Sequence, residues 1–159
     1  MAVHGLEALE ARRMFSIQIS TGDSELFSDS QSSSVSIESV AVDQLLVKTP
    51  TTEQIVSFDP AEDLAVTAGG EFNSLLIGQL RTWGSITIDV RSGDSNILIR
   101  ELRLSGDLEL RTGEGHDRID IARSVFAGSL GIVSDRGNDE ISLTRTTVSR
   151  SFELNTGDN

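Results

Sequence analysis

Apolar and polar residues alternate along the second half of the chain, and the alternation returns with a constant period of 22 residues. The first apolar pair of a typical unit is Ile86 and Ile88, two residues apart. The same two columns continue through Leu64 and Val66, Leu108 and Leu110, Leu130 and Ile132, and Phe152 and Leu154. Alternation of period two is typical of a strand with one buried face. The pattern therefore predicts one short strand at the start of every unit.

Every unit contains two further apolar segments. One is a second pair two residues apart: Leu75 and Ile77, Ile97 and Ile99, Ile119 and Ile121, and Ile141 and Leu143. The other is a single inward position, which holds Leu104, Phe126 and Val148, with Thr82 in the earliest copy. Three inward segments in each period predict a coil whose apolar side chains are buried only when successive units stack.

Stacked units of this kind predict a right-handed parallel β-helix, an all-β solenoid with 22-residue coils. Neighbouring coils of such a solenoid lie about 4.8 Å apart, and the hand follows from the strong preference of parallel crossovers for right-handed connections. An antiparallel sandwich also contains short alternating strands, but it gives no reason for a constant spacing. We therefore expect the β-helix.

The regular repeat divides the chain into three parts. Residues 62–159 hold the 22-residue coils and end inside a repeat, which indicates either a fragment or self-association through the open C-terminal coil. Residues 16–61 are expected to form irregular early coils with a Ser-rich loop at 28–34. Residues 1–15 are expected to form an N-terminal capping or sorting segment, with a short capping helix over their Leu-rich and Glu-rich stretch.

Composition and charge narrow the choice of partners. Aromatic residues make up 4% of the chain, so the core is expected to consist mainly of Ile, Leu and Val. The net charge of −12 repels a polyphosphate backbone, and no basic stripe with interleaved aromatics is evident, so nucleic acid is not expected as a partner. No apolar run is long enough for membrane insertion. The absence of cysteine fits either a reducing or an oxidising compartment.

The turn after the first strand of each unit is the most distinctive polar feature. Gly115 and Gly137 occupy equivalent places in it, and so do Asp117 and Asp139. Glycine here is expected to adopt a positive φ, and aspartate to accept hydrogen bonds from backbone donors in the bend. Stacked carboxylates also suit calcium, which prefers six to eight oxygen ligands. Asp117, Asp139 and Asp135 are therefore the candidate calcium ligands, with simple turn chemistry as the competing explanation, and no other cofactor is expected.

Outward-facing positions form columns of their own in the 22-residue register. Asn96, Arg118 and Glu140 share one column, and Glu101, Arg123 and Arg145 share another. Opposite charges therefore often fall on neighbouring coils. A binding stripe is one interpretation, but a solvated ladder of exposed pairs, each contributing about 0–1 kcal/mol, is the expected one.

The turns and the strands beside them follow a motif. Thr-Gly-x-Gly-x-Asp occupies residues 112–117, Ile-x-Ile follows at 119–121, and Gly-x-Leu opens the next coil at 128–130. This pattern resembles the repeats of large secreted or cell-surface parallel β-helix proteins of environmental bacteria, the planctomycete group above all. The stretch from Leu6 to Phe15 is similar to the Leu-Glu-Pro-Arg export motif of such proteins, with Ala11 in place of the proline. The resemblance implies an extracellular or cell-envelope location, and it implies no reaction.

The sequence thus predicts a non-enzymatic structural or adhesive repeat module of a secreted or cell-surface protein. A calcium-binding surface repeat domain is the first alternative, and a fragment of a carbohydrate-active β-helix protein is the second. Catalysis is not expected. Polysaccharide cleavage needs carboxylates at acid–base separations, drawn from several coils, and no such set is visible in the sequence. His4 and His116 are too far apart in sequence to suggest a metal pair. A surface glycan or a protein is the expected ligand, and Trp83 is the candidate aromatic platform for a sugar.

Overall fold

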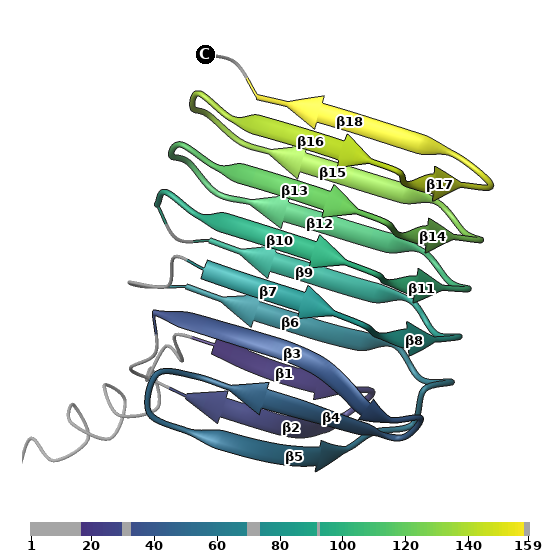
Figure 1. The fold of residues 1–159 in the computed structure, drawn as a ribbon. Coiled ribbons are helices and arrows are strands. Elements are labelled where there is room, and N and C mark those ends of the chain that lie inside the picture. The colour runs from purple at the N-terminus through teal and green to yellow at the C-terminus, as the bar shows by residue number, and fades with distance from the viewer. Residues whose placement is uncertain (1–16, 30–32, 70–73, 92, 158–159) are drawn as a thin grey trace, which may run out of the picture.

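The structure is a computed structural model that describes residues 17–29, 33–69, 74–91 and 93–157. Over these residues it is all β and contains no helix. Parallel strands wind into a right-handed β-helix whose coils stack along one axis (Figure 1). The fold class predicted from the repeat is therefore confirmed. The expected capping helix and the segment 1–15 lie outside the described residues.

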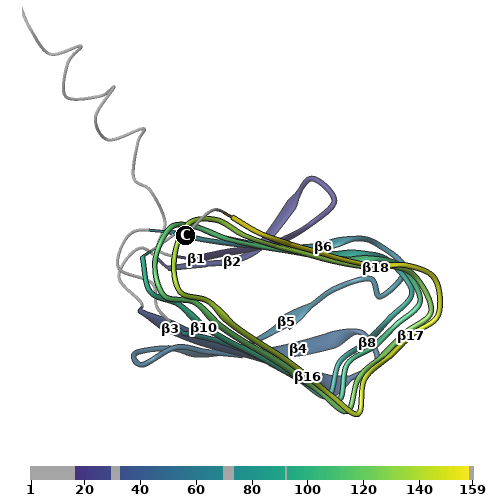
Figure 2. The same cartoon turned by 90° about the horizontal axis from the view of Figure 1, so that it is seen from above.

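The coils have three sides, and each side is a sheet (Figure 2). Sheet A holds the first strand of each coil: β6 (Leu64–Ala68), β9 (Ile86–Val90), β12 (Leu108–Thr112), β15 (Leu130–Ser134) and β18 (Phe152–Thr156). Sheet B holds the second: β7 (Ser74–Gly78), β10 (Asn96–Arg100), β13 (Arg118–Ala122) and β16 (Glu140–Thr144). Sheet C, the short side, holds β8 (Arg81–Thr82), β11 (Arg103–Leu104), β14 (Val125–Phe126) and β17 (Thr147–Val148). Partners in these coils are 22 residues apart, so the sequence period is also the pairing register.

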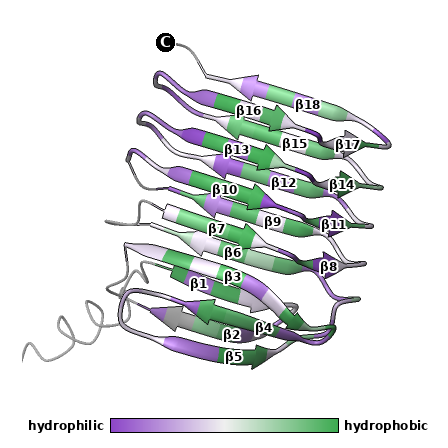
Figure 3. Cartoon of the chain, in the orientation of Figure 1, coloured by the Kyte–Doolittle hydropathy of each residue, from purple (hydrophilic) through white to green (hydrophobic). Residues whose placement is uncertain are grey.

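Aliphatic columns fill the interior of the coils. On β10, Ile97 pairs with Leu75 of the coil below and with Ile119 of the coil above, and these three side chains are almost completely buried. Figure 3 shows the resulting alternation of hydrophobic and hydrophilic positions along the strands. Each buried side chain of this size contributes about 1.5–3 kcal/mol to folding. The core is therefore continuous along the axis, and each coil depends on its neighbours.

The N-terminal part, for which irregular early coils were expected over residues 16–61, consists of hairpins and one strand parallel to β7. β1 (Ile17–Thr21) and β2 (Ser24–Asp29) form an antiparallel hairpin on the end of sheet A, joined by a two-residue loop with Gly22 at a φ of 52°. β3 (Ser34–Ala41) runs parallel to β7, and β4 (Gln44–Lys48) and β5 (Glu53–Ser57) then follow antiparallel. The connections between these strands are tight turns, and a parallel connection needs a much longer crossover. The strands joined by these turns are therefore antiparallel.

The Ser-rich stretch 28–34 is only partly a loop. Among its described residues, Asp29 ends β2 and Ser34 begins β3, while residues 30–32 lie outside the described part of the chain.

The two outermost strands at opposite ends of the stack differ in character. At the N-terminal end, β5 is mostly polar, and its Glu53 forms an ion pair of 3.3 Å with Lys48. Charged side chains on an outer strand discourage pairing with another molecule. At the C-terminal end, β18 exposes Phe152 and Leu154, each nearly half accessible to solvent. Self-association through this coil stays a prediction.

Candidate functional site

The turn aspartates predicted as calcium ligands serve as hydrogen-bond acceptors between coils. Asp117 is buried, and its Oδ1 accepts hydrogen bonds from Ser95 N at 2.9 Å and from Ser95 Oγ at 2.5 Å. Asp139 Oδ1 accepts from Asp117 N at 3.0 Å. Each carboxylate thus satisfies a backbone donor of the coil before it. Both aspartates therefore make the backbone contacts expected of turn chemistry, and calcium binding stays a prediction.

Asp135 lies apart from this column in its contacts. It is exposed and lines a shallow hollow with Arg91, Arg111 and Val133, which face outward from sheet A. No group of three or more His, Asp or Glu side chains in the described residues is placed to hold a metal ion. The structure therefore brings Asp117 and Asp139 into one hydrogen-bonded column and does not add Asp135 to it.

Buried oxygens without a protein partner remain beside this turn. Within the described part of the chain, Asp117 Oδ2, Thr112 Oγ1 and Ser134 Oγ are buried and make no hydrogen bond to protein. Thr112 and Ser134 pair in register at the ends of β12 and β15, just before their turns. Buried oxygens of this kind ordinarily bind water, and a cation is the other occupant with suitable chemistry.

Thermal unfolding in EDTA and in millimolar calcium tests whether water or calcium occupies the space beside these buried oxygens. We expect the same midpoint in both buffers, because Asp117 Oδ1 and Asp139 Oδ1 are already committed to backbone donors. A ligand that binds only the folded state must raise the midpoint. A calcium-dependent rise of several degrees that is lost on replacing both Asp117 and Asp139 by Asn would contradict this expectation and establish a calcium ladder.

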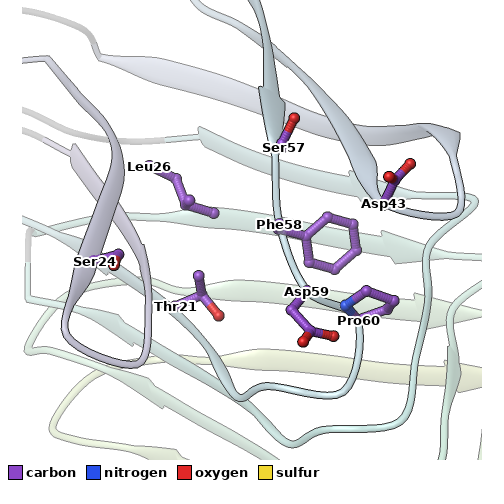
Figure 4. A pocket seen from close by; sticks show the side chains of 8 residues that line it. All are labelled: Thr21, Ser24, Leu26, Asp43, Ser57, Phe58, Asp59 and Pro60. Carbon is purple, nitrogen blue, oxygen red and sulfur yellow. The ribbon is translucent and has the colours of Figure 1, made fainter.

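A hollow lies where the N-terminal strands meet the first coil (Figure 4). It has a volume of about 450 Å³ and is lined by Thr21, Ser24, Leu26, Asp43, Ser57, Phe58, Asp59 and Pro60. Much of its polar lining serves the local backbone: Asp59 Oδ1 accepts from Ala61 N at 2.9 Å, and Pro60 O accepts from Trp83 N at 2.8 Å. The second contact joins the segment after β5 to the first coil, so we assign this hollow a structural role.

Three adjoining hollows lie along the outer side of sheet C and the bend that leads into it from sheet B. Their volumes are about 570, 290 and 330 Å³, and Arg81 lines all of them. Arg103 and Trp83 each line two. We call this surface the arginine groove and define it by Gln79, Arg81, Trp83, Glu101, Arg103 and Arg123.

The arginine groove has a local charge opposite to that of the whole chain, because it combines three arginines with one glutamate. Arg123 pairs with Glu101 at 3.0 Å. Arg81 and Arg103 lie in register on β8 and β11, so their backbones are about 4.8 Å apart. In the described residues, the ion pairs include neither Arg81 nor Arg103. Two guanidinium groups therefore face solvent with their donors available.

An unusual backbone conformation supports the rim of the arginine groove. The first residue after each sheet B strand has a φ between 51° and 56°, and none of these residues is glycine: Gln79, Glu101, Arg123 and Arg145. A left-handed conformation costs a residue with a side chain about 1–2 kcal/mol. Hydrogen bonds to the next coil hold the bend, as from Glu101 N to Ala122 O at 3.1 Å. The side chains of these four residues are exposed at the bend between sheets B and C.

Trp83 forms the apolar part of the arginine groove. Its side chain is 62% exposed, while its backbone N–H is held by Pro60 O. The next two positions in its column are Ser105 and Ala127, whose small side chains leave an open shelf beside the indole. The indole is therefore presented on a fixed backbone next to two free guanidinium groups.

Sequence reasoning identified parts of this surface without joining them. It singled out Trp83 as a platform and placed Glu101 and Arg123 in a charge ladder, whose pairing across coils is confirmed. It missed Arg81 and Arg103. Their signal was available, because they are separated by one period and each precedes an inward residue, Thr82 or Leu104.

No family model, no curated protein and no solved structure matches this chain. Within the described residues, no helix has the length and apolar character needed to cross a membrane.

Proposed function

We propose that the chain is a non-enzymatic structural or adhesive repeat module of a secreted or cell-surface protein. The observation that carries this proposal is the in-register stacking of the coils, which repeats the same outward columns from coil to coil. A solenoid of this kind is rigid along its axis and offers long outer faces for contact. The proposed location is extracellular or in the cell envelope, as the resemblance of the repeat to secreted β-helix proteins implies.

The polar residues of the interior support a structural role. Asp117 and Ser124, both buried, bind backbone donors of the preceding coil: Asp117 Oδ1 accepts from Ser95 N, and Ser124 Oγ accepts from Leu102 N at 3.2 Å. Such side chains replace water for donors in the bends between strands. These hydrogen bonds stabilise the fold itself, and the outer faces are the surfaces that we propose for interaction.

Surface labelling of intact cells of the source organism tests the location. An antibody against the purified chain is expected to label intact cells, and protease added outside is expected to remove the label. A cytosolic marker serves as the control for lysis. Recovery of the chain only from the cytosolic fraction would overturn the proposed surface role.

Incubation with a panel of soluble polysaccharides tests the absence of catalysis. We expect no new reducing ends and no unsaturated ends after prolonged incubation, with a commercial pectinase as the positive control. Product formation that purifies together with the chain would replace the adhesive proposal by a carbohydrate-active one.

A further inference from the structure

We infer that the arginine groove binds an anionic polysaccharide, an inference that rests on the proposed adhesive role and names its ligand class. Arg81 and Arg103 pair with carboxylate or sulfate groups of the polymer. Trp83 carries the flat apolar face of one sugar ring.

The charge of the arginine groove is the first reason. Guanidinium groups bind carboxylates and sulfates through paired N–H donors, with a geometry that lysine does not offer. Arg81 and Arg103 follow one another along the solenoid axis and make no ion pair with the described residues, so both are available to a polymer that runs along this axis. The net charge of −12 repels a polyanion from the rest of the chain, so attraction is confined to this local excess of cations.

The shape of the arginine groove is the second reason. Ligand sites commonly combine an apolar surface with a few converging polar groups. The shelf beside Trp83 is lined by Ser105, Ala127 and the exposed face of Val125. A sugar ring matches this surface, because its apolar face fits the indole while its hydroxyl groups reach Ser105 and its acidic group reaches an arginine.

A polysaccharide fits the arginine groove better than an acidic peptide does. An extended peptide gains most of its affinity by adding a strand to an unpaired sheet edge. β11 is paired on both sides, and beside the edge strand β8 the backbone N–H of Trp83 already donates to Pro60 O at 2.8 Å. The groove therefore offers only the face of sheet C, where the backbone groups of a peptide would lie unpaired against Trp83 and Val125.

Trp83 supplies a direct reporter, because it is the only tryptophan in the chain. Its emission is followed while polygalacturonate, heparin or neutral dextran is added to the purified protein at low salt. Polygalacturonate presents carboxylates and heparin presents sulfates in addition, so the two polymers distinguish the anions. We expect a blue shift with at least one polyanion, none with dextran, and weaker binding as salt is added, since salt screens exposed charges.

Charge variants locate the binding. Replacing Arg81 and Arg103 together by Gln is expected to weaken polyanion binding by at least about tenfold, because two charge-assisted contacts are lost. Arg136→Gln with Arg150→Gln is the matched control, since both residues are exposed, lie outside the groove and remove the same net charge. The control is expected to change the affinity less than about twofold. Trp83→Ala is measured by retardation in gels that contain the polymer and is expected to bind about tenfold more weakly.

Each outcome bears on the arginine groove separately from the proposed surface role. Equal losses in the two arginine pairs would show nonspecific attraction and overturn the assignment. A shift with poly-glutamate but with neither polysaccharide would assign the groove to an acidic protein segment instead. Surface labelling without polyanion binding would contradict only the inference about the arginine groove. A cytosolic location of the chain would contradict the proposed function. Equal thermal midpoints of the arginine variants and the wild type confirm that loss of binding is not loss of folding.

Discussion

Ile97→Asp is expected to abolish cooperative folding of the purified chain. Ile97 is fully buried between Leu75 and Ile119 in adjacent coils, so its replacement removes about 1.5–3 kcal/mol of hydrophobic stabilisation. A buried carboxylate without a partner adds several kcal/mol more. The sum is comparable to the whole stability of a typical domain, about 5–15 kcal/mol. Circular dichroism is expected to show loss of β structure at room temperature.

Asn96→Asp is the matched control for this prediction. Asn96 precedes Ile97 on β10, is exposed and pairs in register with Arg118. A carboxylate at this position faces solvent and an opposite charge, so the free energy of unfolding is expected to change by less than about 0.5 kcal/mol. Equal thermal midpoints of the two variants would show that residue 97 does not face the core, and would refute the inward assignment of the column.

The interior of the coils was predictable from the sequence because burial and pairing share one period. Ile86, Leu108 and Leu130 are separated by the same number of residues in the chain and by one sheet spacing in space. A slip of one residue in this register would expose every inward side chain, so the pattern fixes both the strands and their neighbours. The fold follows from the repeat for this physical reason.

The N-terminal strands were harder to predict because their pairing depends on turns. Ile17 and Ile19 alternate as a coil strand does, and both are buried. Gly22 and Asp23 then reverse the chain within two residues, so β2 returns antiparallel. A two-residue loop that begins with glycine is a recognised hairpin signal. The Gly22-Asp23 loop is similar in sequence to the later Gly-containing turns, so the sequence did not distinguish an antiparallel hairpin from a parallel coil.

The candidate site was only partly predictable, since it combines columns with different roles. The stacking of Asp117 and Asp139 and their contacts with backbone donors were predicted, but the sequence did not indicate that the donors belong to the preceding coil or that Ser95 Oγ also donates to Asp117. The arginine groove depends on which side chains face outward on the two-residue strands of sheet C. Strands this short show no alternation of their own, and only the register of the whole coil orients Arg81 and Arg103.

The close stacking of coils also predicts opposite effects for two glycines three residues apart. At Gly128, where sheet C turns into sheet A, an added Cβ would lie 2.2 Å from Gly106 O and 2.4 Å from Asp107 Oδ1. Both distances are far shorter than van der Waals contact, and Gly106 O belongs to the backbone, which cannot move aside easily. Asp107 Oδ1 also accepts a hydrogen bond from Ser129 N at 2.7 Å, which the shift would strain. Gly128→Ala is therefore expected to lower stability by about 2–3 kcal/mol and the thermal midpoint by roughly 5–10 °C.

Gly131→Ala adds the same methyl group on β15 and is expected to act in the opposite direction. The nearest atom to its added Cβ, Leu108 O, is 3.9 Å away, which is ordinary contact. Glycine within a strand costs about 0.5–1 kcal/mol relative to alanine, because the unfolded chain loses more freedom on folding. The thermal midpoint is expected to rise by about 2 °C. A similar fall for both alanine variants would contradict close backbone stacking at Gly128 as the cause, because only that position lacks room for a Cβ.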